Sequence, residues 1–135
     1  MGLLFDNDYT ILQDFGLVIE EDINQRFLVV KNYPLERGLY LSDGQPLNEI
    51  EVLLIIPSNY NTSGGDMFWT FPKISRVDSV PIPAYADCDE RVFNGKNYNR
   101  WSRHWTLESW LPKTDNIIKI LGRVEWALRN PNADK

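Results

Sequence analysis

The chain contains one cysteine, Cys88, and one histidine, His104. A cysteine thiolate can attack an activated carbonyl carbon and form a thioester that stays reactive toward amines. A histidine can carry the accompanying protons near neutral pH. A single cysteine cannot form an internal disulfide, and one cysteine with one histidine does not provide a metal site. Covalent chemistry in this chain therefore depends on Cys88, and the sequence indicates no metal and no cofactor.

The residues around Cys88 leave two interpretations open. The segment Ala84-Tyr-Ala-Asp-Cys-Asp-Glu90 is polar and acidic, so we expect it to be irregular and exposed. Exposure favours a catalytic cysteine, because a reagent can reach the sulfur. The carboxylates of Asp87 and Asp89, however, disfavour ionisation of the thiol. The alternative is an incidental free cysteine, a residue type that is commonly buried as a small hydrophobe.

The composition indicates a globular protein with one domain, residues 1–135. Hydrophobic residues make up 43% of the chain and charged residues 24%. The sequence has no secretory signal and no apolar stretch of membrane-spanning length, so we expect a cytoplasmic protein that does not enter a membrane. The net charge of −5 argues against binding to nucleic acid, because a phosphate backbone would be repelled.

Two helices are predicted, one near each end of the chain. The first is short, carries Ile11 and Leu12, begins at a cap supplied by Asp6 or Asp8, and stops at Gly16. The second has apolar residues at helical spacing and is capped by Thr114 or Asp115. Its apolar face consists of Ile117, Leu121, Val124 and Leu128, and Asn130-Pro131 ends it.

Between the helices, β-branched and aromatic runs predict several strands. They cover residues 26–33, 38–42, 49–56 and 67–71, with a turn at 43–44 and a long polar loop at 57–66. From Ser75 to Asn99 we find little regular periodicity, and Pro81 and Pro83 discourage a helix or a central strand. Strands grouped together between terminal helices indicate an α+β fold.

The strand, loop and final helix resemble those of a known superfamily. Ile55-Ile-Pro57, Tyr60 and Asp66-Met-Phe-Trp-Thr-Phe-Pro72 resemble the strand–loop–strand of ubiquitin-conjugating enzymes. The later segments are similar to prokaryotic family E of that superfamily: Asn99-Arg-Trp-Ser-Arg-His104, Trp110-Leu-Pro112 and Val124-Glu-Trp-Ala-Leu128. The resemblance runs from about Phe5 to Leu128. The chain departs from the usual pattern because Asn61 replaces a loop proline and a His-Pro-Asn motif before the cysteine is absent.

The resemblance implies the ubiquitin-conjugating-enzyme (UBC) fold, an antiparallel meander sheet with an N-terminal helix and a C-terminal crossover helix. It implies that Cys88 accepts a ubiquitin-like protein as a thioester and that His104 supports transfer to an amine. An amide must then stabilise the oxyanion, for which Asn94, Asn97 and Asn99 are candidates. Ser102, Arg103 and Trp110 are supporting candidates, although Trp110 with Pro112 also suits a structural role before the last helix.

The resemblance also implies partners. These are a ubiquitin-like protein, an adenylating activating enzyme and a deconjugating protease from the same operon, with phage defence as the expected setting. A catalytically inactive scaffold that binds a ubiquitin-like protein or its activating enzyme is the alternative. An unrelated α+β interaction domain is a third interpretation.

Aromatic residues after the irregular segment predict part of the core. Tyr98, Trp101 and Trp105 are spaced at i, i+3 and i+7, which suits one buried stripe more than a binding face. Basic residues flank this stripe and predict a small basic patch for salt bridges or a protein partner: Lys96, Arg100 and Arg103.

Overall fold

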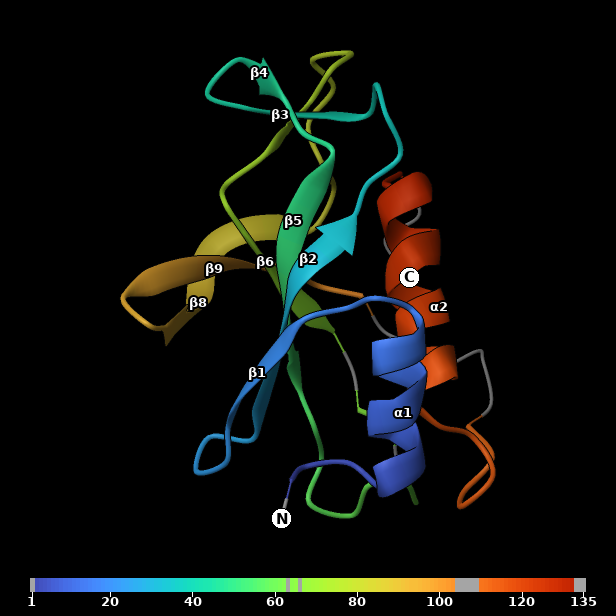
Figure 1. Cartoon of the computed structure of the whole chain (residues 1–135). Coiled ribbons are helices and arrows are strands. Elements are labelled where there is room, and N and C mark those ends of the chain that lie inside the picture. The colour runs from blue at the N-terminus through green and yellow to red at the C-terminus, as the bar shows by residue number, and fades with distance from the viewer. Residues whose placement is uncertain (1, 63, 66, 104–109, 133–135) are drawn as a thin grey trace.

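The computed structural model describes residues 2–62, 64–65, 67–103 and 110–132, with the backbone alone for residues 86–90. Within this part of the chain two helices accompany a six-stranded antiparallel sheet (Figure 1). The predicted α+β class is confirmed. The helices are α1 (Asp6–Asp14) and α2 (Ile117–Arg129). The sheet strands are, in spatial order, β1 (Ile19–Asp22), β2 (Phe27–Pro34), β5 (Glu49–Ile55), β6 (Phe68–Phe71), β9 (Lys96–Trp101) and β8 (Tyr85–Phe93).

The strand order follows the chain as far as β6 and then reverses. The chain leaves β6, reaches the edge of the sheet as β8, and returns as β9 between β8 and β6. The connection from β6 to β8 contributes β7 (Ser75–Arg76), which joins β3 (Tyr40–Ser42) and β4 (Gln45–Pro46) in a small second sheet. The expected meander therefore holds for β1, β2, β5 and β6, whereas β8 becomes an edge strand.

One face of the large sheet is covered by both helices. Alternate residues of β2 and β5, such as Leu28 and Val52, point to this face because side chains alternate along a strand. They pack against Leu12 of α1 and Val124 of α2. We call this cluster the helical-face core. The predicted apolar face of the last helix is confirmed, since its four residues are all buried here.

The opposite face is covered by the β8–β9 hairpin, which lies away from the helices in Figure 1. The other alternating set from β2, β5 and β6 packs against residues of the hairpin. This hairpin-face core consists of Phe27, Val29, Leu53, Trp69, Phe93 and Tyr98. Tyr98 and Trp101 are both buried, which confirms that they belong to the core, but they lie on a strand and in opposite cores, so the prediction of one stripe is wrong. Trp105 lies outside the described residues.

The predicted irregular stretch from Ser75 to Asn99 is also wrong, because it contains β7, β8 and most of β9. The helix caps differ from those predicted as well. Asn116 caps α2 by accepting a hydrogen bond from the Ile118 backbone N–H at 2.9 Å. Phe5 is the N-cap of α1, and Asp8 accepts from the Phe5 backbone N–H at 3.0 Å. None of the helices in the described part of the chain is both long and apolar enough to pass through a bilayer.

Candidate active site

Cys88 lies in β8, one of the two edge strands of the large sheet. The prediction that it lies in an irregular segment is wrong. The pairing of β8 with β9 changes register around Cys88. Ala86 pairs with Arg100, whereas Arg91 pairs with Tyr98, so residues 87–90 lie opposite the single residue Asn99. Extra residues of this kind form a bulge, and bulges are common at sheet edges and next to active sites.

The bulge reverses the face to which β8 directs its side chains. Tyr85 precedes the bulge and lies against Trp101 in the helical-face core, with ring centroids 5.5 Å apart. Arg91 follows it and places its guanidinium 4.8 Å from the ring centroid of Trp69 in the hairpin-face core. In a regular strand, residues six positions apart would share a face. Cys88 therefore belongs to the segment in which the strand changes faces.

Asn99 is the asparagine that the structure places opposite the bulge. It is 3% exposed. The Tyr85 hydroxyl accepts a hydrogen bond from the Ile74 backbone N–H at 3.0 Å and donates to Asn99 Oδ1 at 3.3 Å. This contact fixes the orientation of the Asn99 amide beside the strand that carries Cys88.

The other two candidate asparagines lie elsewhere on the hairpin. Asn94 occupies the β8–β9 turn with Gly95, and both residues have positive φ, as a two-residue type I′ turn requires. Its Nδ2 donates to Glu20 Oε2 at 3.1 Å. Asn97 is exposed on β9 and pairs with Val92. Neither lies opposite residues 87–90.

Ser102 and Arg103 fix the chain immediately after β9. The Ser102 backbone N–H donates to the Ala84 carbonyl at 2.9 Å, which holds the two ends of the hairpin together. The Arg103 side chain is fully buried, and its Nη2 donates to the Pro131 carbonyl at 3.1 Å. Its guanidinium also lies 5.0 Å from the ring centroid of Trp101. These contacts indicate a structural role for Arg103, which is buried and so lies outside any surface patch. Of the other predicted basic residues, Lys96 forms a salt bridge, to Glu51 at 2.7 Å.

His104 lies outside the described residues, so its position relative to Cys88 remains a prediction. Trp110 lies against the loop that follows β5. Its Nε1 donates to the Asn61 carbonyl at 2.9 Å, and its ring is tilted against Tyr60 at 6.4 Å. A Cβ at Gly64 would lie 2.4 Å from the indole, so only glycine fits there without movement. Trp110 thus joins the loop to the segment before α2, as its structural interpretation predicted.

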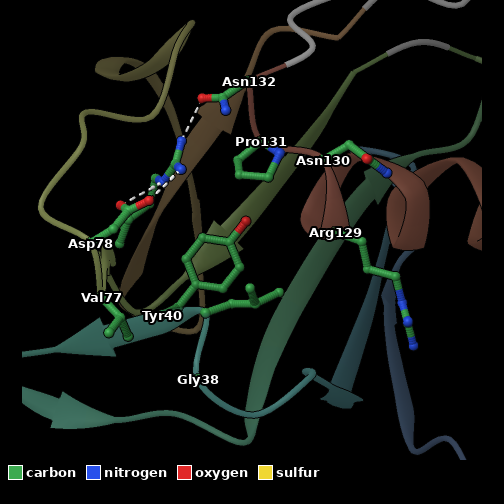
Figure 2. Close-up of a pocket in the computed structure, with 10 residues that line it drawn as sticks. Gly38, Tyr40, Val77, Asp78, Arg129, Asn130, Pro131 and Asn132 are labelled. Atoms are coloured by element: carbon green, nitrogen blue, oxygen red, sulfur yellow. Dashed lines mark hydrogen bonds and ion pairs between the residues drawn. The ribbon is translucent and has the colours of Figure 1, made fainter.

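A pocket of about 420 Å³ lies at the C-terminal end of α2 (Figure 2). Arg76 lies in its wall and is already engaged, since Nε and Nη2 donate to Asp78 and Nη1 donates to Asn132. The hydrogen bonds from Arg76 hold the pKa of the Asp78 carboxyl below its usual range. None of the predicted site residues that the structure describes lines this pocket.

A buried carboxylate, that of Asp8, supports the same loop after β5 that Trp110 contacts. Its burial was not predicted from the sequence. Asp8 is 2% exposed, and its Oδ1 accepts from the Tyr60 hydroxyl at 3.0 Å and from the Ile117 backbone N–H at 3.1 Å. Burial and this carboxylate raise the pKa of the Tyr60 hydroxyl above its usual range. The burial of Asp8 could not be predicted from the sequence, because an aspartate at this position also suits an exposed first turn of a helix.

Comparison with known proteins gives one match that covers nearly the whole chain. The family model described as prokaryotic E2 family E matches residues 4–131. The chain is also 31% identical over 70 residues to the DNA-directed RNA polymerase subunit beta' of Chlorobium phaeobacteroides (strain DSM 266 / SMG 266 / 2430). That match takes in 50% of this chain but only 4% of the subunit, so it carries no argument about function. No solved structure matches the chain.

Proposed function

Because the chain belongs to prokaryotic E2 family E, we propose that it is a conjugating enzyme with the UBC fold. In this proposal an adenylating activating enzyme delivers a ubiquitin-like protein to Cys88, which holds it as a thioester and passes it to an amine. The α+β architecture, with a curled antiparallel sheet and two helices on one face, is consistent with this family. We further propose that residues 1–135 form one such domain.

The observation that carries the proposal is the place of the one thiol in the chain. Cys88 lies in the edge strand, in the segment where four residues of β8 oppose only Asn99. An edge strand can be approached by a partner chain from its outer side. A catalytic thiol needs such access, since the incoming carbonyl is attached to a whole protein.

The chemistry proceeds in two displacements. The activating enzyme presents the C-terminal carboxyl of the ubiquitin-like protein bonded to AMP or to its own thiol. The Cys88 sulfur attacks this carbonyl carbon, the new S–C bond forms, and AMP or the activator's thiol leaves. An acceptor amine then attacks the thioester, an amide bond forms, and the Cys88 thiolate leaves. We assign removal of the amine proton to His104.

Each displacement passes through a tetrahedral oxyanion that needs a hydrogen-bond donor. We propose that the Asn99 amide supplies it, because Asn99 lies opposite the bulge and the Tyr85 hydroxyl orients its Oδ1. This replaces the asparagine of the absent His-Pro-Asn motif. Asn94 and Asn97 are weaker candidates, since the first is bound to Glu20 and the second is exposed away from the bulge.

A gel without reductant tests the proposal. The chain is incubated with ATP, an adenylating activating enzyme and a ubiquitin-like protein. We expect an adduct of the combined mass that disappears on addition of reductant and that Cys88→Ser abolishes. In the same assay, His104→Ala should load normally and discharge to free lysine more slowly. A reductant-sensitive adduct that persists in Cys88→Ser would contradict the assignment.

The acidic neighbours of Cys88 support a second candidate function. Asp87 and Asp89 disfavour a thiolate between them. A scaffold that binds the ubiquitin-like protein or its activator needs no thiolate. Complex formation that is equal in the wild-type chain and in Cys88→Ser, with no adduct in either, would favour the scaffold over the enzyme.

A further inference from the structure

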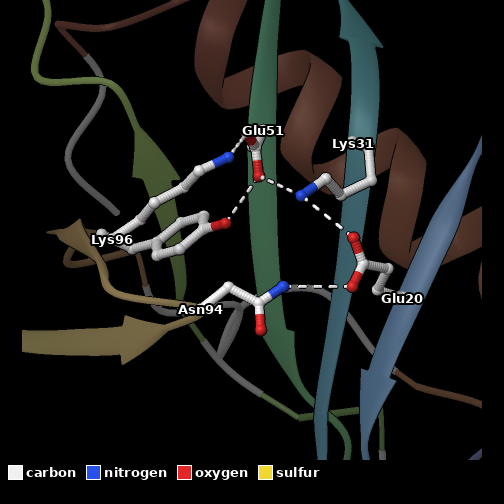
Figure 3. Close-up of polar contacts among 6 residues, drawn as sticks. Glu20, Lys31, Glu51, Asn94 and Lys96 are labelled. Carbon is white, nitrogen blue, oxygen red and sulfur yellow. Dashed lines mark hydrogen bonds and ion pairs between the residues drawn. The ribbon is translucent and has the colours of Figure 1, made fainter.

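Six side chains form one polar cluster on the outer side of the hairpin-face core (Figure 3). We call it the Glu51 cluster, and its members are Glu20, Lys31, Glu51, Asn94, Lys96 and Tyr98. Glu51 is central, because its Oε1 accepts from the Tyr98 hydroxyl at 2.6 Å and its Oε2 accepts from Lys96 Nζ at 2.7 Å. Its side chain is only 14% exposed.

From Glu51 the contacts continue to β1, the edge of the sheet on the side away from β8. Lys31 Nζ lies 3.1 Å from Glu51 Oε1 and 3.2 Å from Glu20 Oε1. The second oxygen of Glu20 accepts from Asn94 Nδ2 at 3.1 Å. The contacts therefore pass from β9 through β5 and β2 to β1, and return to the turn of the β8–β9 hairpin.

Two of these links join parts of the sheet that do not pair with one another, namely β9 with β5 and the β8–β9 turn with β1. β6 lies between β5 and β9, and β1 and β8 are the two edges of the sheet. Lys96 and Tyr98 reach Glu51 by passing over Phe71 of β6, whose ring lies 5.2 Å from Lys96 Nζ and 5.6 Å from the Tyr98 ring. The cluster thus fixes the curl that brings the hairpin turn back to β1.

The same contacts bear on the strand that carries Cys88. Within the described residues β8 pairs with β9 alone, and that pairing is interrupted opposite Asn99. Before the bulge β8 is held by Tyr85 against Trp101, and after it by Phe93 and the turn. The Glu51 cluster fixes the second of these two attachments. Cys88 lies between them.

We propose that the Glu51 cluster positions the Cys88 segment, with Asn94 and Glu20 as positioning residues that act through the hairpin turn. The inference rests on the proposed use of Cys88 as the nucleophile. In this proposal Asn94 holds the strand in place and does not act as the oxyanion donor. A network of several groups around a mostly buried carboxylate can hold a segment, whereas one exposed ion pair contributes little.

The substitution Asn94→Asp tests this directly. Aspartate tolerates the positive φ of this turn position, so the turn itself is preserved. The new carboxylate replaces the N–H donor that faces Glu20, and the two like charges should separate the turn from β1. Because the chain has one cysteine, the rate of alkylation by iodoacetamide reports on Cys88 alone.

We expect Asn94→Asp to raise the limiting alkylation rate by about two- to fivefold, measured above the pH at which the thiol has ionised. Adding Glu20→Gln to that variant supplies an amide that can donate to the new carboxylate, and it should restore the wild-type rate. Asn97→Asp is the matched control, since it makes the same charge change at an exposed position of the same hairpin. It should leave the rate unchanged.

An unchanged rate in Asn94→Asp, no restoration by Glu20→Gln, or an equal rise in Asn97→Asp would each overturn the inference. The urea midpoint of every variant shows whether a rate change reflects global unfolding, because a faster alkylation with an unchanged midpoint must arise from local movement. Alkylation needs no partner protein. A negative alkylation result would therefore reject the positioning role, whereas a negative thioester gel would reject the proposed function, and either can occur without the other.

Discussion

At the scale of single residues, Asp8 joins three parts of the chain through one carboxylate. It accepts from the Phe5 backbone N–H at the start of α1, from the Tyr60 hydroxyl in the loop after β5, and from the Ile117 backbone N–H at the start of α2. Buried carboxylates persist where several donors satisfy them. This one aligns both helices with the loop that Trp110 covers.

We expect Asp8→Asn to lower the free energy of unfolding by about 2 kcal/mol or more, because the amide nitrogen would face a donor and leave it unsatisfied. Urea denaturation followed by far-ultraviolet circular dichroism measures the change. Asp6→Asn is the matched control, since Asp6 is an exposed acid in the same first turn and should cost no more than roughly 0.5 kcal/mol. Equal losses in the two variants would show that the charge at the start of the helix, and not the buried hydrogen bonds of Asp8, accounts for the effect.

The candidate nucleophile could be predicted from the sequence more readily than the residues that would assist it. The thiol was identified because the chain has one cysteine. The choice among Asn94, Asn97 and Asn99 needed the strand register, which no local pattern contains. Asn94-Gly95 did carry a usable signal, since this dipeptide between alternating residues is typical of a two-residue hairpin.

At the scale of elements, the strands of the large sheet that were not predicted from the sequence are β1, β8 and β9. Pro81 and Pro83 precede β8, and aspartates in its centre have low strand propensity. The bulge at residues 87–90 also disrupts the alternation by which a strand is recognised. By contrast β2, β5 and β6 were predicted to within about two residues, because each is an apolar run bounded by proline or turn residues.

The Glu51 cluster should make stability depend on pH. Burial raises the pKa of the Glu51 carboxyl, but hydrogen bonds from Lys96, Tyr98 and Lys31 outweigh burial and hold it below its usual range. A lowered carboxyl pKa stabilises the fold above the ordinary value of 4.5, and this contribution is lost as pH falls below it. Burial, with the contact to Glu51, raises the pKa of Tyr98 above 10.0, so the contribution of its hydroxyl is lost only at higher pH.

We therefore expect Glu51→Gln to lower the free energy of unfolding at pH 7 by roughly 1 to 3 kcal/mol. The difference from wild type should shrink as the pH falls below 4.5 and through the lowered pKa of the Glu51 carboxyl, because the wild-type carboxyl then becomes protonated. Urea midpoints across this fall in pH measure it. Glu49→Gln changes an exposed carboxylate of the same strand and should lie within about 0.5 kcal/mol of wild type. A constant difference at every pH would contradict the role of the Glu51 charge.

At the scale of the whole molecule, the large sheet is covered on one face by helices and on the other by its own hairpin. The alternating pattern of β5 becomes a continuous apolar run at its end, as suits a strand covered on both faces, and Val52, Leu53 and Leu54 are all buried. What covers the second face was not predictable. It depends on β8 lying outside β9, a contact between segments whose order in space is not their order in sequence.

Among the residues that the structure describes, this two-sided cover places one fully buried tryptophan in each core. Trp69 belongs to the hairpin-face core beneath Arg91, and Trp101 is stacked on Phe68 at 5.2 Å in the helical-face core. An indole emits at longer wavelength once water reaches it. A variant that keeps only one of these two rings, with the other four tryptophans of the chain replaced by phenylalanine, would therefore report on one side alone. With the two such variants, a state that had released only the hairpin could be distinguished from one that had lost its helices.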